Sequence, residues 1–81
     1  MITIYGNSYS NTIVGTSYSS VQNFSIYGFA GNDKIYGGNY NDMLNGGDGN
    51  DYLSSGAGND TVYGGSGSDT MFGGSGIDYL N

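Results

Sequence analysis

From Gly28 to Asn81 the sequence reads GFAGNDKIY, GGNYNDMLN, GGDGNDYLS, SGAGNDTVY, GGSGSDTMF and GGSGIDYLN, six blocks of nine residues without a remainder. Each column of this register has its own chemistry. The first, second and fourth positions are mostly Gly, the sixth is always Asp, and the eighth is always apolar. A disordered Gly-rich linker, the main alternative on composition alone, has no reason to keep its acids and its aliphatic residues in phase.

The sixth and eighth columns predict the fold of each block. The acid column consists of Asp33, Asp42, Asp51, Asp60, Asp69 and Asp78. The apolar column consists of Ile35, Leu44, Leu53, Val62, Met71 and Leu80. Gly and the Asn-Asp pairs favour a turn in the first half of a block, and the three residues after Asp alternate in orientation as in a strand. Strands this short are stable only if successive coils stack, so we expect a solenoid.

The pattern continues upstream of these six blocks in a weaker form. Residues 6–14 fit one block, with Asn11 at the acid position, and residues 15–27 form a block that carries four extra residues. The apolar position upstream is filled by Ile4, Ile13 and Ile26. We therefore expect one continuous domain, with degenerate N-terminal coils at 1–27 and six regular repeats at 28–81.

The composition of the chain disfavours several classes of function. The 81-residue chain has a net charge of −6, which disfavours nucleic acid and anionic lipid as partners and favours cations. It contains no His, Cys or Glu, so a Ser or Cys nucleophile would have no His or Glu base beside it. Asp pairs resembling those of glycosidases are better explained by their even repetition. We expect no enzyme activity and no transmembrane segment, because no apolar run approaches about 20 residues.

The acid column predicts a metal ion. Stacked coils lie about 4.8 Å apart, so the carboxylates of one column repel each other, and Lys34 is the one basic residue of the chain. Calcium accepts six to eight oxygen ligands in tolerant geometry, whereas magnesium demands an octahedron and zinc prefers His and Cys. The alternative is that Asp only forms turns. It is disfavoured because such turns use Asn, Ser and Asp interchangeably, and this column never varies.

The six blocks resemble the RTX repeat, G-G-x-G-x-D-x-U-x with U apolar, of secreted toxins, proteases and lipases. The resemblance covers residues 28–81 closely and residues 1–27 loosely. It implies an all-β fold, a right-handed parallel β-roll (a β-solenoid) with two nonapeptide repeats per coil. Residues eighteen apart would then stack, with one acid column at each edge and a thin apolar core between the columns.

The resemblance also implies the calcium ligands, because each ion of the family lies between turns two repeats apart. The implied acid pairs are Asp33 with Asp51, Asp51 with Asp69, Asp42 with Asp60, and Asp60 with Asp78. The implied carbonyl donors are Gly38, Gly47, Gly49, Gly56, Gly58, Gly65, Gly67, Gly74 and Gly76. Phe29 and Tyr40 replace Gly in their turns and should weaken those sites. Asn11 is neutral, so we expect no strong site there.

For function, the resemblance implies secretion and folding in extracellular calcium. The sequence shows neither an effector domain nor a cap, and both of its ends read as strands. We expect the edges around Ile2, Ile4, Tyr79 and Leu80 to stack copies head to tail into an extracellular, calcium-stabilised filament. The alternative is a calcium-dependent folding or secretion module cut from a larger secreted protein.

The aromatic residues leave a third possibility open. Tyr27 and Tyr63 share one outward column, and Tyr36 and Phe72 share the other. These columns are expected to form a cross-strand ladder that supports the sheet, or a surface that contacts glycan or another subunit. The sequence does not separate these two interpretations.

Overall fold

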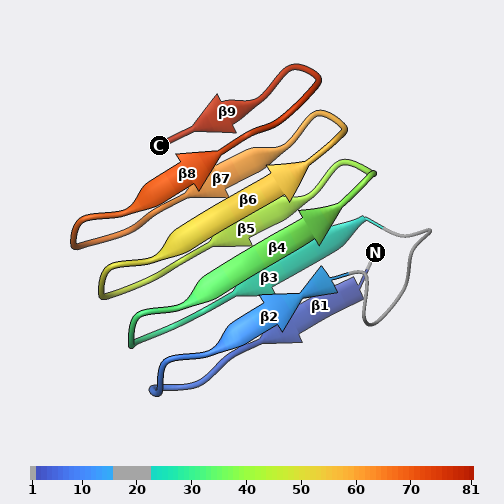
Figure 1. The fold of residues 1–81 in the computed structure, drawn as a ribbon. Coiled ribbons are helices and arrows are strands. Elements are labelled where there is room, and N and C mark those ends of the chain that lie inside the picture. Colours follow the sequence, from blue (N-terminus) through green and yellow to red (C-terminus); the bar gives the residue numbers. More distant parts are fainter. Residues whose placement is uncertain (1, 16–22) are drawn as a thin grey trace.

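The computed structural model describes residues 2–15 and 23–81, and within them the chain forms nine short strands (Figure 1). The strands of the odd-numbered layer are β1 (Ile2–Tyr5), β3 (Phe24–Tyr27), β5 (Met43–Asn45), β7 (Thr61–Tyr63) and β9 (Tyr79–Leu80). The strands of the even-numbered layer are β2 (Thr12–Val14), β4 (Lys34–Gly38), β6 (Tyr52–Gly56) and β8 (Thr70–Phe72). No described residue belongs to a helix that is long and apolar enough to cross a membrane.

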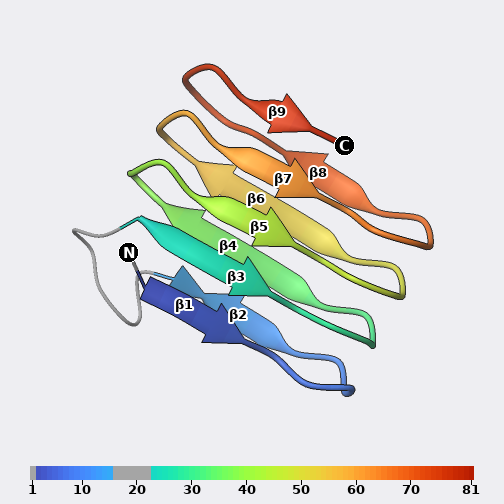
Figure 2. The same cartoon turned by 180° about the vertical axis from the view of Figure 1, so that it is seen from behind.

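The strands form two parallel sheets that face each other. In the described residues, one sheet has the order β1-β3-β5-β7-β9 and the other the order β2-β4-β6-β8. The chain passes from one sheet to the other after every strand, so each coil adds one strand to each layer (Figures 1 and 2). The predicted parallel β-roll with two repeats per coil is confirmed.

Register follows the nine-residue period. From β3 onward, partners are eighteen residues apart, as in the pairing of Leu44 with Val62. Between the first two coils the offset is 22 residues, as in the pairing of Ile4 with Ile26. The difference, 22 − 18 = 4, equals the four extra residues of the 15–27 block. Residues 16–22 of that block lie outside the described part of the chain.

Each inner strand contributes a buried aliphatic side chain to the core, and β3 also contributes Phe24. The aliphatic residues are Ile26, Ile35, Leu44, Leu53 and Val62, all 0% exposed. Burying each such side chain contributes about 1.5–3 kcal/mol. The predicted core is wrong at its C-terminal end, where Met71 is only partly buried and Leu80 is 46% exposed, because the strands β8 and β9 have a neighbouring coil on one side only.

Two strands are longer than expected. The sequence predicts three extended residues after each Asp, but β4 and β6 each have five. They extend because Gly38 and Gly56 still pair across coils in the same parallel register. The polypeptide therefore leaves the sheet later at β4 and β6 than at the three-residue strands β5 and β7.

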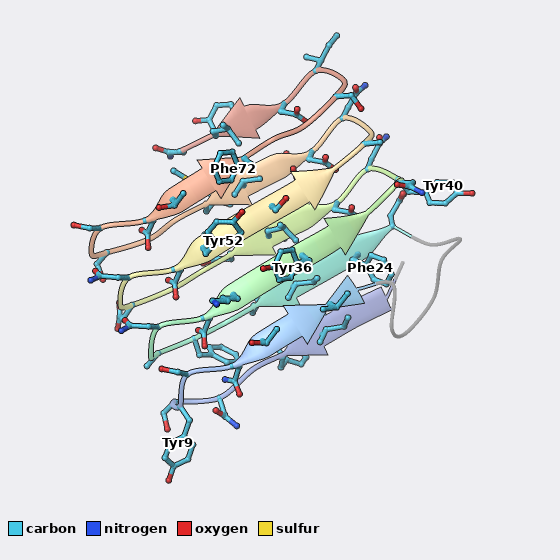
Figure 3. The ribbon with its side chains drawn as sticks, in the orientation of Figure 1. Tyr9, Phe24, Tyr36, Tyr40, Tyr52 and Phe72 are labelled. Atoms are coloured by element: carbon cyan, nitrogen blue, oxygen red, sulfur yellow. The ribbon has the colours of Figure 1, made fainter. Side chains whose placement is uncertain are left out.

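An aromatic row runs up the outer face of the even-numbered sheet. Figure 3 shows Tyr36, Tyr52 and Phe72 one above the other on β4, β6 and β8. The ring centroids are 5.9 Å apart between Tyr36 and Tyr52, and 5.5 Å apart between Tyr52 and Phe72. The contacts therefore run diagonally through Tyr52 and support the sheet as a cross-strand ladder. Glycan contact through the Tyr columns stays a prediction.

Candidate metal centre

The turns of the solenoid gather the acid column into two rows, one at each edge of the sheets (Figure 1). The turns that lead into β4, β6 and β8 carry Asp33, Asp51 and Asp69. The turns that lead into β5, β7 and β9 carry Asp42, Asp60 and Asp78. This is the distribution that the eighteen-residue stacking predicted.

One oxygen of each carboxylate joins two coils. The backbone N–H of Asp33 donates to Oδ1 of Asp51 at 2.8 Å, and the N–H of Asp51 donates to Oδ1 of Asp69 at 2.8 Å. In the other row, the N–H of Asp42 donates to Oδ1 of Asp60 at 2.7 Å. Asp60 donates in the same way to Asp78 at 2.9 Å. The structure thus brings together the four Asp pairs that were predicted to share an ion.

The second oxygen is different. Oδ2 of Asp33, Asp51 and Asp60 is buried and has no hydrogen-bond partner among residues 2–15 and 23–81. In the fourth buried acid, Asp42, Oδ2 accepts a hydrogen bond from the N–H of Gly38 at 2.8 Å. A buried charge without a partner is strongly unfavourable, so a cation beside Oδ2 would remove the largest electrostatic cost of this fold.

The pKa values reflect that cost. Burial raises the pKa of Asp51 and of Asp60 to about 6 from the ordinary value of 3.8. The charges of Asp33 and Asp69 add to the rise for Asp51. Burial also raises the pKa of Asp42. At neutral pH, the ionised forms of Asp51 and Asp60 are destabilised by burial, and a bound divalent cation would offset that free-energy cost.

The Gly that begins most of the repeats leaves space beside the carboxylates. A Cβ placed on Gly46 would lie 2.6 Å from Oδ2 of Asp51 and 2.8 Å from the carbonyl oxygen of Gly64. Gly28 has the same relation to Asp33, with 2.6 Å to Oδ2. Carboxylate and carbonyl oxygens thus converge where no side chain intrudes. This donor set, oxygen only and partly charged, fits calcium.

Turn carbonyls complete the oxygen-rich edge. The Cα of Gly47 packs against the carbonyl of Phe29, and the Cα of Gly49 packs against the carbonyl of Gly31 one coil earlier. Gly47 has a φ of 81°, which admits this approach. Among residues 2–15 and 23–81, no three acidic side chains are grouped so as to hold a metal by themselves. The assignment of individual Asp and Gly residues as ligands stays a prediction.

The two turns that depart from the Gly pattern differ from each other. Phe29 has a φ of 67° and so adopts the left-handed conformation that Gly has in later turns. Its ring stacks on Tyr5, with centroids 5.9 Å apart, which helps offset the strain. Tyr40 projects from the opposite edge and is 45% exposed (Figure 3). Weaker ion binding at these turns stays a prediction.

Comparison with known proteins agrees with this geometry. A family model described as RTX calcium-binding nonapeptide repeat (4 copies) matches residues 3–21, 27–62 and 46–80. The chain belongs to this RTX family. RTX nonapeptide repeats bind calcium ions, so calcium is the cofactor of this β-roll. No curated protein and no solved structure matches the chain.

The sequence did not lead us to two buried residues that form hydrogen bonds between coils, one on β3 and one on β6. Phe24 lies two positions before Ile26 and therefore occupies the acid column, where it is 1% exposed and donates its N–H to Oδ1 of Asp42 at 2.8 Å. Counting back from Ile26 would have found it. Ser55 stands where other repeats begin with Gly, and its hydroxyl donates to the carbonyl of Gly73 at 3.0 Å.

Proposed function

We propose that this RTX chain is an extracellular structural protein whose β-roll is held together by calcium, without enzymatic activity. The observation that carries the proposal is the set of buried Oδ2 atoms of Asp33, Asp51 and Asp60, which accept no hydrogen bond from any residue that the structure describes. Proteins with RTX repeats are typically secreted and bind extracellular calcium, which supports the location. In such a protein, binding free energy becomes folding free energy.

A calcium titration of chelator-treated protein tests this role. Far-UV circular dichroism should change from a coil spectrum to a β spectrum as calcium is added, and magnesium should leave the coil spectrum unchanged. Magnesium is the matched control because it carries the same charge but demands an octahedral, largely hydrated shell. A β spectrum that neither calcium nor chelator alters would refute the calcium-dependent role.

We further propose that copies of this chain stack end to end into a filament. The support is the exposure of core residues at the C-terminal coil, where Leu80 is 46% exposed while Val62, in the same column, is 0% exposed. The exposed coil presents unpaired strand edges on β8 and β9 that match the strands of another coil. A second copy placed there would bury Leu80 as Val62 is buried.

The strand order limits how two copies can stack. Along the solenoid path, the strand after β9 would lie beside β8. A second copy can put its β1 there and its β2 beside β9, provided that it is turned by about half a turn around the solenoid axis. An unturned copy with β1 beside β9 would leave β2 about 9.6 Å from β8, twice the pairing distance. We therefore propose a filament with a half-turn between subunits.

Paired cysteines test this register in a chain that contains no native Cys. Thr3→Cys with Thr70→Cys should give a ladder of disulfide-linked oligomers in calcium, because the turned copy places these positions opposite each other. The control pair, Thr3→Cys with Tyr79→Cys, would link only an unturned stack. Cross-strand neighbours lie within the Cα distance that a disulfide spans.

The alternative is a calcium-dependent folding or secretion module of a larger secreted protein. The same exposure of Leu80 favours it, since a following coil or cap in a longer chain would cover that residue equally well. Light scattering on the calcium-loaded chain separates the two proposals. Growth of large particles supports the filament, whereas a calcium-folded species that stays monomeric at high concentration supports the module.

A further inference from the structure

The turn at Asn11 has a neutral amide at the position where the later turns have a carboxylate. Asn11 stands at the acid position of the first block, and its Nδ2 donates to the carbonyl of Tyr9 at 2.7 Å and to Oδ1 of Asn7 at 2.9 Å. Oδ1 of Asn7 also accepts a hydrogen bond from the N–H of Tyr9 at 2.9 Å. The turn, which Tyr9 marks at the lower left of Figure 3, is therefore closed by its own side chains.

The Nδ2 atom lies where the later repeats have Oδ2. A Cβ placed on Gly6 would be 3.3 Å from Nδ2 of Asn11, just as one on Gly28 would be 2.6 Å from Oδ2 of Asp33. Tyr9 occupies the fourth position of its block, the position whose carbonyl is an expected calcium ligand at Gly49. A hydrogen-bond donor thus faces this carbonyl in the first turn, whereas an acceptor-only carboxylate stands there in the regular repeats.

We propose that the side-chain amide of Asn11 takes the place of calcium in the first turn, so that this turn closes without an ion. The inference rests on the proposed calcium role of the other turns. In those turns a cation must lie between oxygen atoms that would otherwise repel each other. In the first turn the two N–H groups of one amide make the same bridge within the chain.

The metal-independent turn is also joined to the first acid of its row. The N–H of Asn11 donates to Oδ1 of Asp33 at 2.8 Å, the same bond that Asp33 makes to Asp51. The opposite row likewise begins on a residue without a carboxylate, Phe24, whose N–H donates to Oδ1 of Asp42. Each row of calcium turns therefore follows a residue that carries no charge. The coils that contain these residues offer a preformed edge on which the calcium-dependent coils can stack.

The substitution Asn11→Asp tests the proposal directly. It replaces a donor by an acceptor that faces Tyr9 and Asn7. In chelator with enough sucrose to fold part of the metal-free chain, the folding equilibrium constant should fall about thirtyfold for two lost hydrogen bonds. Calorimetry should also show one more calcium ion bound at saturation. The control, Asn11→Ala, loses the hydrogen bonds without supplying a carboxylate and should bind no additional ion.

The reverse exchange gives a second test, which remains informative if Asn11→Asp does not fold. In chelator with enough sucrose to fold part of the metal-free chain, Asp51→Asn should give more β signal than Asp51→Ala, because the new amide can donate to the carbonyl of Gly49. In ¹⁵N spectra of the folded wild type, the side-chain amide of Asn11 should be protected from solvent exchange. Equal β signal for Asp51→Asn and Asp51→Ala in chelator, or an unprotected Asn11 amide, would overturn the proposal.

The outcomes also separate this inference from the function on which it rests. If wild-type protein ignores calcium, the proposed calcium role fails. If wild-type protein folds with calcium but Asn11→Asp binds the same number of ions and folds equally well in chelator, only the substitution of an amide for the ion is wrong.

Discussion

The turn before β2 is closed by hydrogen bonds from the amide of Asn11, whereas in the turns before β4 and β6 Oδ2 of Asp33 and of Asp51 has no partner among the described residues. Both kinds of turn lead into a short strand with one buried aliphatic residue, Ile13 in the first coil and Leu53 in a later one. The strand half of a repeat therefore does not depend on the acid. The acid makes the turn half conditional on a cation, and this confines the calcium dependence to the later coils.

Removal of calcium should have the largest effect on stability, and it should affect the later coils more than the first coil. In hydrogen exchange with limiting calcium, the amides of β5 to β9 should lose protection first, because the stacked carboxylates of those coils repel each other. The amides of β1 and β2 should lose protection last. Uniform loss along the chain would show that the first coil has no stability of its own.

The substitution Asp51→Ala should have the next largest effect, on calcium binding. Asp51 lies between Asp33 and Asp69 and is expected to serve two ions, so the calcium midpoint should rise about tenfold. Calorimetry should show fewer ions bound. Asp48→Ala is the matched control, because Asp48 lies outside both rows. Equal effects of the two substitutions would mean that total charge, not the row, governs calcium binding.

Gly47→Ala should destabilise the calcium-bound fold by about 1–3 kcal/mol. The new Cβ would overlap the carbonyl of Phe29, at a φ of 81° that L-residues avoid. Asn7, at the corresponding position of the first turn, does not have a positive φ, so that turn does not require Gly there. Chemical denaturation in calcium measures the loss, and Ser66→Ala, at an exposed turn position, should change little.

Acidification should act in opposite directions with and without calcium. In the metal-free fold the pKa of Asp51 and Asp60 is about 6, above the ordinary 3.8, so folding takes up protons. That stabilisation is fully present below about pH 4 and is lost as the pH rises through about 6. In chelator, β signal should therefore increase from about pH 7 to about pH 5, while the calcium midpoint should rise because protons compete with calcium.

The aromatic contacts should have the smallest effect. Tyr52→Ala removes the central ring of the outer row in the regular coils, and Tyr5→Ala removes the ring that stacks on Tyr27 at 5.6 Å in the first coil. Each should cost about 0.5–1.5 kcal/mol in thermal or chemical unfolding. Neither should change the number of calcium ions bound. A change in ion number for Tyr52→Ala would indicate that the row positions the turns.

Much of this architecture follows from the repeat itself. A period of nine with one apolar residue per period can bury that residue only if the strands stack, and this led to the parallel layers and the core from Ile26 to Val62. The division of the acid column into two rows needs two repeats per coil, which the resemblance to the RTX repeat implied. The sequence pattern did not reveal the roles of Asn11 and Phe24, because both depend on which atoms lie next to them in the folded turns.

The linear sequence therefore determines the coil, its register and the location of the charge, since these depend on spacing along one chain. Contacts between coils determine the rest. Oδ1 of Asp51 accepts a hydrogen bond from Asp33, while Oδ2 has no partner in the described part of the chain. Leu80 is exposed while Val62 is buried, because the burial of each depends on a neighbour eighteen residues away. Such neighbours are specified by stacking, which exists only once the chain has folded.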